Sequence, residues 1–470
     1  MDDTNYERTD SRLLASDLLH EQYKRKLIFM NFDLVLLNGE IVVFQNGVLR
    51  RAHAHIGISN GRISKISSNT LHGKQEIDVT HLTVLPGVID TQVHFREPGL
   101  THKEDLESGT RSAALGGVTS VFEMPNTNPP TVSLSDLQAK FRLAKDRAWV
   151  NYAFYVGASH DNIGELATLE QTPGCSGIKI FMGSSFGSLL VDNESDLELI
   201  LKNGTRRVIV HAEDELRLKE RKSIATESKT VTKHHIWRDP QTSLIATTKL
   251  LQVARKVGRK VHVLHVTTKE EVSLLEKNKD IASFEITPNH LSFVAPDCYE
   301  RLGSLVQMNP PIRELEHQQA LWKAVQNGSA DIIGTDHAPH TKEEKSKEYP
   351  SSPSGIPGVQ TLVPVMLNHI HQGKLSLERF VELTCENPRK VFGCQSKGRI
   401  EEGLDADFTL VDLKKERIIE NKWIASKCGW TPFDGMKVTG FPTHTIIDGK
   451  IIMQEDTLLQ PGLGTKILFT

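Results

Sequence analysis

Five polar side chains stand at the ends of apolar, strand-like runs in the middle of the chain: His94, Lys179, His211, His265 and Asp336. Taken singly, a histidine at the end of a strand is typical of a hydrogen-bonded rim residue. Several on one rim, together with a lysine and an aspartate, favour a metal site, because imidazoles and carboxylates are the ligands of catalytic zinc. Zinc in such a site keeps one position for water and lowers the pKa of that water toward neutrality, which yields a hydroxide nucleophile.

Lys179 is the unusual member of this group. A lysine ammonium cannot ligate a cation, so Lys179 has to be neutral or chemically modified if it takes part. The alternative is an ordinary lysine in a surface salt bridge. The surrounding Ser-Gly-Ile-Lys-Ile-Phe (residues 176–181) is typical of a buried strand, where a free ammonium is costly. The sequence therefore favours an altered lysine over a surface one.

The elements that position these residues alternate between strands and helices, and they predict a (β/α)8 barrel, an α/β fold, over residues 86–399. Eight such units over ~250 residues have the count and length of that fold, whose active sites lie at the carboxyl ends of the strands. A doubly wound open sheet is the alternative, but it would not explain why polar residues fall at the strand ends. Four intervening segments predict helices: Lys103 to Leu115, Ser195 to Lys202, Ser243 to Val257 and Glu314 to Val325.

Both ends of the chain are typical of β-structure and predict one small β-sandwich domain made of residues 30–85 and 400–470. Short apolar runs near the N-terminus are separated by Asn-Gly pairs at residues 38–39, 46–47 and 60–61, which are strong hairpin signals. Residues 444–454 predict two strands around Asp448-Gly449. Residues 1–29 are predicted to be a polar extension, in which Leu13, Leu14, Leu18 and Leu19 have the spacing of one short helix.

Composition excludes several classes of protein. The chain has 470 residues and a formal net charge of −3, whereas a nucleic-acid binder usually carries a basic excess. No run of about 18 apolar residues occurs, which excludes a membrane span, and the polar, acidic start is unlike a secretory signal. The five cysteines are scattered, odd in number and without a CxxC pair, which favours reduced thiols in a cytoplasmic enzyme.

Several motifs give this chain a specific resemblance. The run DTQVHFREPG at residues 90–99 resembles the opening motif of class I-like dihydroorotases in the amidohydrolase superfamily. Further matches are MPNT (124–127), GIKIFMG (177–183), NPP (309–311), GTDHAPH (334–340) and PSGIPG (353–358). They occur in the family's order over residues 31–460, including the two-ended β domain. The resemblance therefore implies a metal-dependent cyclic amidohydrolase.

The resemblance also implies a role for each strand-end residue. Lys179 resembles the family's carboxylated lysine, whose carbamate bridges two zinc ions and removes the charge problem of an ammonium. His211 and His265 resemble ligands of the second metal. His94 and Asp336 resemble ligands of the first, and Asp336 also resembles the general acid and base.

Four more residues resemble the family's substrate-binding groups. Arg96, Asn126 and His340 are similar to the groups that hold the substrate's carboxylate, and an arginine can bind a carboxylate with two parallel hydrogen bonds. Asn309 is similar to an asparagine that recognises the substrate ring. The implied substrate is a small cyclic amide with a carboxylate.

One residue departs from the family pattern. Gln92 stands where the first histidine of an HxH metal motif is expected. A glutamine amide oxygen is a neutral and weaker ligand than an imidazole. Three outcomes stay open: a working site of reduced affinity, an enzyme with a single metal at the second site, or a chain that has lost catalysis.

The implied reaction is the reversible conversion of (S)-dihydroorotate and water to N-carbamoyl-L-aspartate, a step of pyrimidine (UMP) synthesis. Dihydropyrimidinase, hydantoinase and allantoinase are alternatives within the same superfamily. The alternative outside enzymes is a non-catalytic relative that assembles with aspartate transcarbamoylase, for which Gln92 is the sequence support. A homodimer is a further expected partner, and neither nucleic acid nor membrane is expected.

Overall fold

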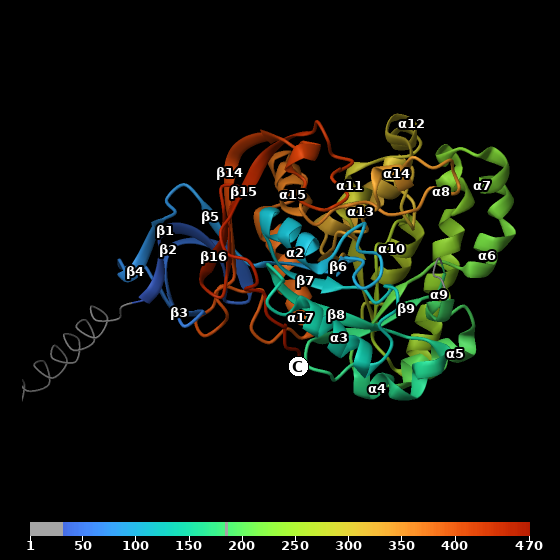
Figure 1. Ribbon diagram of the computed structural model, residues 1–470, viewed down its shortest axis with the longest axis horizontal. Coiled ribbons are helices and arrows are strands. Elements are labelled where there is room, and N and C mark those ends of the chain that lie inside the picture. Colours follow the sequence, from blue (N-terminus) through green and yellow to red (C-terminus); the bar gives the residue numbers. More distant parts are fainter. Residues whose placement is uncertain (1–31, 184–186) are drawn as a thin grey trace, which may run out of the picture.

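The computed structural model describes residues 32–183 and 187–470, which form a sheet surrounded by helices and a second sheet beside it (Figure 1). The predicted polar extension at residues 1–29, with Leu13, Leu14, Leu18 and Leu19, lies outside the described residues. Within the described residues, no helix is both long enough and apolar enough to cross a membrane.

Eight parallel strands form the barrel that the sequence predicts. In spatial order they run from β13 to β6 in unbroken sequence. Their bounds are β6 (Val88–Val93), β7 (Val118–Glu123), β8 (Asn151–Gly157), β9 (Cys175–Phe181), β10 (Val208–His211), β11 (Val261–Val263), β12 (Ala282–Ile286) and β13 (Ile332–Ile333). Every residue of these strands is buried, as expected for parallel strands covered on both faces. The ends of the sheet meet where the His94 N–H donates to the His337 carbonyl at 2.7 Å.

Helices cover the outside of the barrel, and local capping sets where they begin. The predicted helix at 103–115 starts at Leu106, because the Asp105 side chain accepts from the Ser108 N–H. The longest helix begins at Pro240 after the Asp239 cap and ends before Gly258, whose φ of 75° suits a left-handed C-cap. The barrel helices up to the sixth strand are α2 (Leu106–Leu115), α3 (Leu134–Ala144), α4 (Leu166–Leu169), α5 (Glu194–Lys202), α6 (Glu215–Glu220), α7 (Lys222–Ser228), α8 (His234–Trp237) and α9 (Pro240–Val257). The later helices are α10 (Lys269–Glu276), α11 (Pro288–Ser292), α12 (Asp297–Leu302), α13 (Leu315–Gln326), α14 (Lys342–Lys345), α15 (Leu362–His371), α16 (Leu377–Val381) and α17 (Asn387–Phe392).

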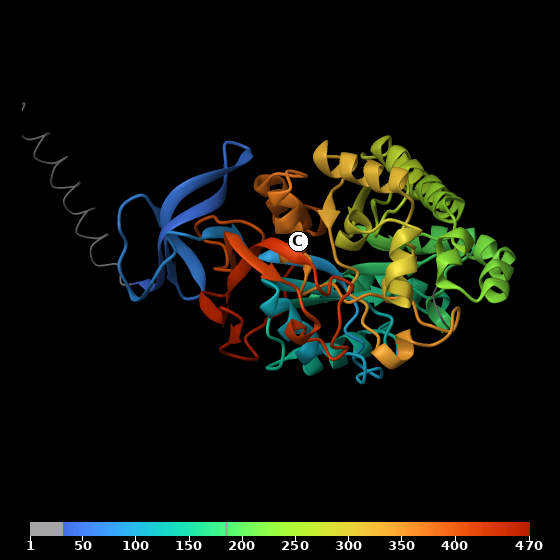
Figure 2. The same ribbon diagram turned by 90° about the horizontal axis from the view of Figure 1, so that it is seen from above.

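The second sheet has nine strands and joins the two ends of the chain. Its bounds are β1 (Phe32–Gln45), β2 (Val48–Ser59), β3 (Arg62–Ser67), β4 (Gly73–Asp78), β5 (Thr83–Pro86), β14 (Phe408–Ile418), β15 (Lys437–Ile447), β16 (Lys450–Gln454) and β17 (Thr457–Leu458). The ends meet where β14 pairs with β5 in antiparallel fashion. Side chains from both halves, such as Leu36 and Ile446, share one core. The expected sandwich is therefore one continuous sheet, and Figure 2 shows its blue N-terminal strands to one side of the barrel.

Three of the four predicted turns are present, and one is not. At residues 46–47, 60–61 and 448–449 both turn residues have positive φ, the conformation of the tight hairpin turn that Asn-Gly and Asp-Gly favour. The prediction of a turn at Asn38-Gly39 is wrong. This pair lies inside β1, where the register against β2 shifts between Leu36 and Gly39. The left-handed asparagine is thus part of a β-bulge, because the partner strand β2 continues past it without reversing.

The last residues of the chain leave the nine-stranded sheet and contact the barrel. Lys466 bridges Tyr152 at the start of β8, and Phe469 bridges Cys394. Ile467 and Phe469 pack in the same buried cluster as barrel residues such as Phe122. The C-terminal segment thus joins the barrel core to the segment that follows α17.

Candidate active site

The predicted strand-end residues lie together on one rim of the barrel. His94 directly follows β6, Lys179 lies in β9 and His211 ends β10. His265 and Asp336 follow β11 and β13 within three residues. All five side chains are deeply buried, between 1% and 7% exposed. Parallel strands direct their carboxyl ends to the same edge of a barrel, which is why residues so distant in sequence meet here.

Three residues of this rim have strained backbones. Arg96, His265 and Asp336 have φ angles of 66°, 36° and 51°, in the left-handed region. Such a conformation costs about 1–3 kcal/mol in a non-glycine residue and persists only where surrounding contacts impose it. The fold therefore spends stability to place these side chains, as is usual at a functional site.

His211 and His265 face one another through ring nitrogens. His211 Nδ1 and His265 Nε2 are 3.0 Å apart, close to the ~3.3 Å that separates two nitrogens on one tetrahedral zinc. His211 Nε2–H donates to Glu213 Oε2 at 3.0 Å, which leaves Nδ1 as a lone-pair donor. Arg238 in turn donates to Glu213 Oε1 at 3.0 Å. Burial lowers the pKa of both imidazoles, so they are neutral and suited to bind a cation.

His94 and Asp336 form the second facing pair. His94 Nδ1–H donates to Asn126 Oδ1 at 2.7 Å, and its Nε2 lies 3.1 Å from Asp336 Oδ1. Gln92 Nε2 donates to the same Asp336 oxygen at 2.9 Å. The other amide atom, Gln92 Oε1, is buried and has no hydrogen-bond partner among the described residues.

Lys179 is buried on the same rim as both pairs. Burial lowers its pKa from 10.5 to about 7. Burial is also the main reason that the pKa values of His94, His211 and His265 are lowered, and a protonated Lys179 lowers them further. Its Nζ lies 4.5 Å from the centre of the Phe181 ring. Within residues 32–183 and 187–470, no three His, Cys, Asp or Glu side chains are arranged to hold a metal ion. Among the described residues, each pair therefore has no third side chain of these four types beside it.

A positively charged corner lies beside the pairs. Burial lowers the pKa of Arg96 to about 10, and its guanidinium forms no ion pair with any described residue. Arg96 Nη2 lies 3.3 Å from His340 Nε2. Lys103 donates to His340 Nδ1 at 3.1 Å, so the ring proton is on Nε2, which donates to the Ser354 carbonyl at 3.1 Å. A buried guanidinium without a counter-ion is a natural site for an anion.

Asn309 belongs to a different hydrogen-bonded group from the other predicted residues. His234 Nε2 lies 3.0 Å from Asn309 Oδ1 and 3.0 Å from the Met308 carbonyl. The other ring nitrogen of His234 lies 3.2 Å from the Tyr349 hydroxyl. This group holds the Asn309 side chain in a fixed orientation.

Sequence reasoning missed four residues of this site: Glu213, Arg238, Lys103 and Glu285. Glu213 follows His211 by two residues, a spacing that could have signalled it, whereas Arg238 is too distant in sequence to be recognised. Glu285 is fully buried, accepts from the Thr91 hydroxyl at 2.7 Å, and has its pKa raised to about 8 by burial. Its position near the end of the buried strand β12 is the same kind of signal that the other strand-end residues give.

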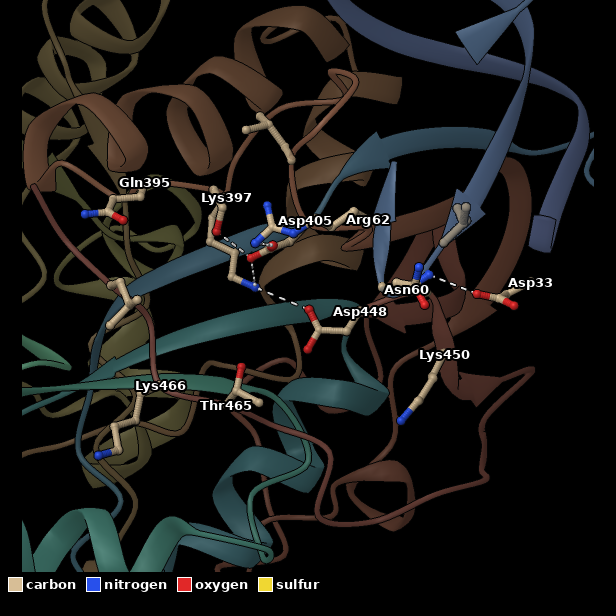
Figure 3. A pocket seen from close by; sticks show the side chains of 16 residues that line it. Asp33, Asn60, Arg62, Gln395, Lys397, Asp405, Asp448, Lys450, Thr465 and Lys466 are labelled. Atoms are coloured by element: carbon tan, nitrogen blue, oxygen red, sulfur yellow. Dashed lines mark hydrogen bonds and ion pairs between the residues drawn. The ribbon is translucent and has the colours of Figure 1, made fainter. Parts of the chain in front are cut away.

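A separate cavity of about 840 Å³ lies between the nine-stranded sheet and the C-terminal segment (Figure 3). Figure 3 shows Lys397 pointing toward Asp405 and Asp448. Lys397 Nζ is 2.9 Å from Asp405, 2.7 Å from Asp407 and 3.8 Å from Asp448. None of the predicted catalytic residues lines this cavity. The charge of its buried lysine, Lys397, is balanced by carboxylates, so we assign the cavity a structural role.

Comparison with known proteins identifies the class. The model of the "Amidohydrolase family" matches residues 83–452, and the chain belongs to this family. A dihydroorotase from Pyrococcus furiosus is 33% identical over 436 residues, covering 92% of this chain and 96% of that protein. The Pyrococcus abyssi dihydroorotase is 36% identical over 416 residues, covering 88% and 94%. These relatives confirm the resemblance to dihydroorotases that the motifs predict.

Solved structures similar to this chain include hydantoinases. The L-hydantoinase (dihydropyrimidinase) of Arthrobacter aurescens is 29% identical with a TM-score of 0.87, covering 93% of this chain and all of that one. A D-hydantoinase is 25% identical with a TM-score of 0.86, covering 93% and 98%. The barrel and the second sheet are therefore the architecture of cyclic amidohydrolases.

Proposed function

We propose that this chain is a metal-dependent cyclic amidohydrolase that interconverts (S)-dihydroorotate and N-carbamoyl-L-aspartate. The observation that carries the proposal is the set of buried groups on one rim: two facing pairs of metal-ligand side chains and Lys179, a buried lysine with no carboxylate in ion-pair contact among the described residues. The substrate is inferred from relatives named dihydroorotase at 33–36% identity over most of the chain.

The donor set fits zinc if Lys179 is carboxylated. A neutral lysine amine attacks carbon dioxide, forming an N–C bond and releasing one proton, and the product is an anionic carbamate with two oxygens. Such a carbamate would complete the set of His211 and His265, whose facing nitrogens are 3.0 Å apart, and would also reach the set of His94 and Asp336. The family implies two zinc ions, and Gln92 makes the set of His94 and Asp336 the weaker of the two. When bound, zinc polarises a carbonyl and lowers the pKa of water.

Arg96, Asn126 and His340 would hold the substrate's carboxylate. The buried Arg96 donates from Nε to the Pro339 carbonyl at 3.3 Å and has no carboxylate in ion-pair contact among the described residues. An arginine can bind a carboxylate with two parallel hydrogen bonds. Asn126 Oδ1 accepts from His94, so its Nδ2 remains to donate. We assign Asn309 to recognition of the substrate ring, held for this role by His234.

Asp336 would act as the general base and acid. Burial alone would raise its pKa, but the contact with His94 outweighs burial and lowers it below the usual value, so Asp336 is ionised. An ionised carboxylate on the rim can accept the proton of the attacking water. It can then deliver that proton to the departing amide nitrogen.

A hydantoinase or dihydropyrimidinase activity is the second candidate, because the solved neighbours of this fold carry those names. Their named substrates differ from dihydroorotate in lacking a carboxylate, so a buried Arg96 with no ion pair among the described residues favours the first candidate. Allantoinase activity and a non-catalytic role as an assembly partner of aspartate transcarbamoylase stay predictions from the resemblance, as do a homodimer and a cytoplasmic location.

Turnover of purified protein tests the function. Dihydroorotate hydrolysis and N-carbamoyl-aspartate cyclisation are measured beside dihydrouracil, hydantoin and allantoin, in buffer with zinc and bicarbonate. We expect turnover of the two carboxylate-bearing substrates. Arg96→Lys should raise KM for dihydroorotate by about 10-fold or more, because the paired hydrogen bonds of the fork are lost. Turnover of dihydrouracil or hydantoin alone would establish the second candidate.

Carbon-13 NMR tests the modified lysine. Protein prepared in ¹³C-bicarbonate should show one carbamate resonance that Lys179→Met lacks. Lys345→Met is the matched control: Lys345 is equally buried, but its Nζ donates to the carbonyls of Gln307, Pro353 and Gly355. Loss of the resonance in Lys345→Met, with retention in Lys179→Met, would contradict the assignment.

A further inference from the structure

Gln92 is turned so that its amide nitrogen, not its oxygen, meets the neighbouring carboxylate. Gln92 is 1% exposed. It lies near the end of β6, two residues before His94. Its Nε2 donates to Asp336 Oδ1 at 2.9 Å. Its Oε1, the atom able to ligate a metal, has no hydrogen-bond partner among the described residues.

The hydrogen bond from Gln92 stabilises and positions the Asp336 carboxylate, which a bound cation would otherwise do. Asp336 Oδ1 faces His94 Nε2 at 3.1 Å and lies within reach of Gln92 at the same time. A carboxylate buried in the rim needs donors, and the amide supplies one without charge. The backbone of Asp336 is held in a left-handed conformation with φ 51°. The hydrogen bond from Gln92 also fixes its side chain, so Oδ1 is kept in a single position.

The two facing pairs are therefore unequal as metal sites. His211 is oriented by Glu213, which is itself paired with Arg238, and such a carboxylate behind a histidine strengthens it as a ligand. His94 is oriented by the neutral amide of Asn126 at 2.7 Å. The pair of His94 and Asp336 thus combines a histidine with a weaker hydrogen-bond partner and a glutamine whose nitrogen already donates to the carboxylate.

We propose that this chain binds one metal ion tightly, at His211, His265 and Lys179, and that Gln92 holds Asp336 by a hydrogen bond in place of a second tightly bound ion. Gln92 is then a positioning residue. The inference rests on the proposed function for the role of Asp336, but the number of metal ions is independent of turnover.

Metal content is the primary test. Wild type, Gln92→His and Gln92→Ala are saturated with zinc and bicarbonate, dialysed against a weak chelator, and analysed for zinc per chain. We expect one equivalent in wild type, two in Gln92→His, which supplies a second imidazole, and one in Gln92→Ala. Gln360→His is the matched control, because Gln360 is equally buried but donates to the Trp423 carbonyl. It should hold one equivalent.

Two equivalents in wild type would overturn the inference, and a loss of one of them in Gln92→Ala would show Gln92 to be a ligand. Isothermal titration of metal-free protein with zinc also gives the number of zinc ions per chain, and it does so even for a variant that turns over poorly. Zero equivalents in wild type would overturn the inference and the metal-dependent function together. One equivalent without turnover would leave the inference standing and contradict the function.

Kinetics separate positioning from a structural role. Gln92→Ala should lower kcat for dihydroorotate by roughly 100-fold, the effect of a slightly misplaced reacting group, with KM changed less than twofold. Gln92→His should recover kcat while its zinc content doubles, because a metal then anchors Asp336. A rise in KM with unchanged kcat in Gln92→Ala would contradict the positioning role.

Discussion

Two buried lysines of this chain have opposite surroundings. Lys179, on the barrel rim, has 1% of its surface exposed and no carboxylate in ion-pair contact among the described residues. Lys397, at the junction of the sheet and the barrel, lies within 4 Å of Asp405, Asp407 and Asp448. Burial lowers the pKa of Lys179 to about 7. Burial would also lower that of Lys397, but the three carboxylates raise it above the usual value.

The difference in surroundings gives Lys179 a chemical role and Lys397 a structural one. A lysine buried alone becomes a neutral amine, which can react with carbon dioxide and present oxygen ligands to a metal. A lysine buried among carboxylates stays a cation and joins segments of the chain. Asp407, one partner of Lys397, also accepts from Asn151 at the start of β8 and from the Asp448 N–H. The Lys397 group thus connects the two sheets.

The largest expected effect is on activity at the barrel rim. Lys179→Met should lower kcat/KM for dihydroorotate by more than the roughly 100-fold that loss of an outer partner of a metal ligand costs, because a ligand is removed. The metal-free variant should be at least as stable as wild type, since an apolar side chain replaces an uncompensated amine. Steady-state kinetics and urea unfolding measure both. Full activity in this variant would break the comparison.

The matching change at the junction should act on stability. Lys397→Met leaves three carboxylates without their cation, and it should lower the free energy of unfolding by about 3–5 kcal/mol. The folded fraction should keep wild-type kcat. Asp448→Asn is the milder variant, because burial and the neighbouring carboxylates already raise the pKa of Asp448 to about 6. Unchanged stability in Lys397→Met would show that the carboxylates do not need this lysine.

A smaller effect, on zinc affinity, is expected from changing Glu213, the residue that accepts a hydrogen bond from His211. Glu213→Gln removes the carboxylate that accepts from His211 and pairs with Arg238, and it should weaken zinc binding by about 10- to 100-fold. Competition with a chromogenic chelator measures the affinity. Glu271→Gln is a control elsewhere in the barrel, where the buried carboxylate accepts from Thr247 and Thr268 hydroxyls. Equal zinc affinities in the two variants would contradict the role of Glu213.

The smallest stepwise effect is a pH dependence of stability, at most about 1.4 kcal/mol for each pH unit. The folded-state pKa of Lys179, about 7, is below its usual value of 10.5, so the unfolded chain binds more protons between these values. The cost of burying Lys179 is complete below pH 7 and disappears as pH rises toward 10.5. Metal-free, bicarbonate-free wild type should therefore gain up to about 1.4 kcal/mol per pH unit relative to Lys179→Met. If the free energies of unfolding of wild type and Lys179→Met changed with pH in the same way, the prediction that Lys179 is buried without a counter-ion would be contradicted.

The fold was largely predictable because its signals are local. Alternation of buried strands with helices predicted the barrel, and paired turn residues such as Asn60-Gly61 and Asp448-Gly449 predicted hairpins. Asn38-Gly39 carried the same signal and was misinterpreted. A left-handed asparagine serves a turn or a bulge equally well, and the choice depended on which residues of β2 lie opposite.

The site was only partly predictable. Strand-end residues and family motifs indicated the ligand candidates, and Gln92 was recognised as a departure. Two features had no local signal: the pairing of Glu213 with Arg238, and the contact of Lys103 with His340. Each joins segments whose distance in the chain says nothing about their distance in the fold.

The sequence by itself determined which chemical groups stand at the strand ends, and therefore the class of reaction they can perform. Only the tertiary structure decided the state of each group. Burial without a carboxylate makes Lys179 an amine that can react, burial with three makes Lys397 a fixed cation, and a single hydrogen bond to Asp336 decides which way the Gln92 amide faces. The physical reason is that solvation and hydrogen bonding depend on neighbours in space, which the order of residues does not specify.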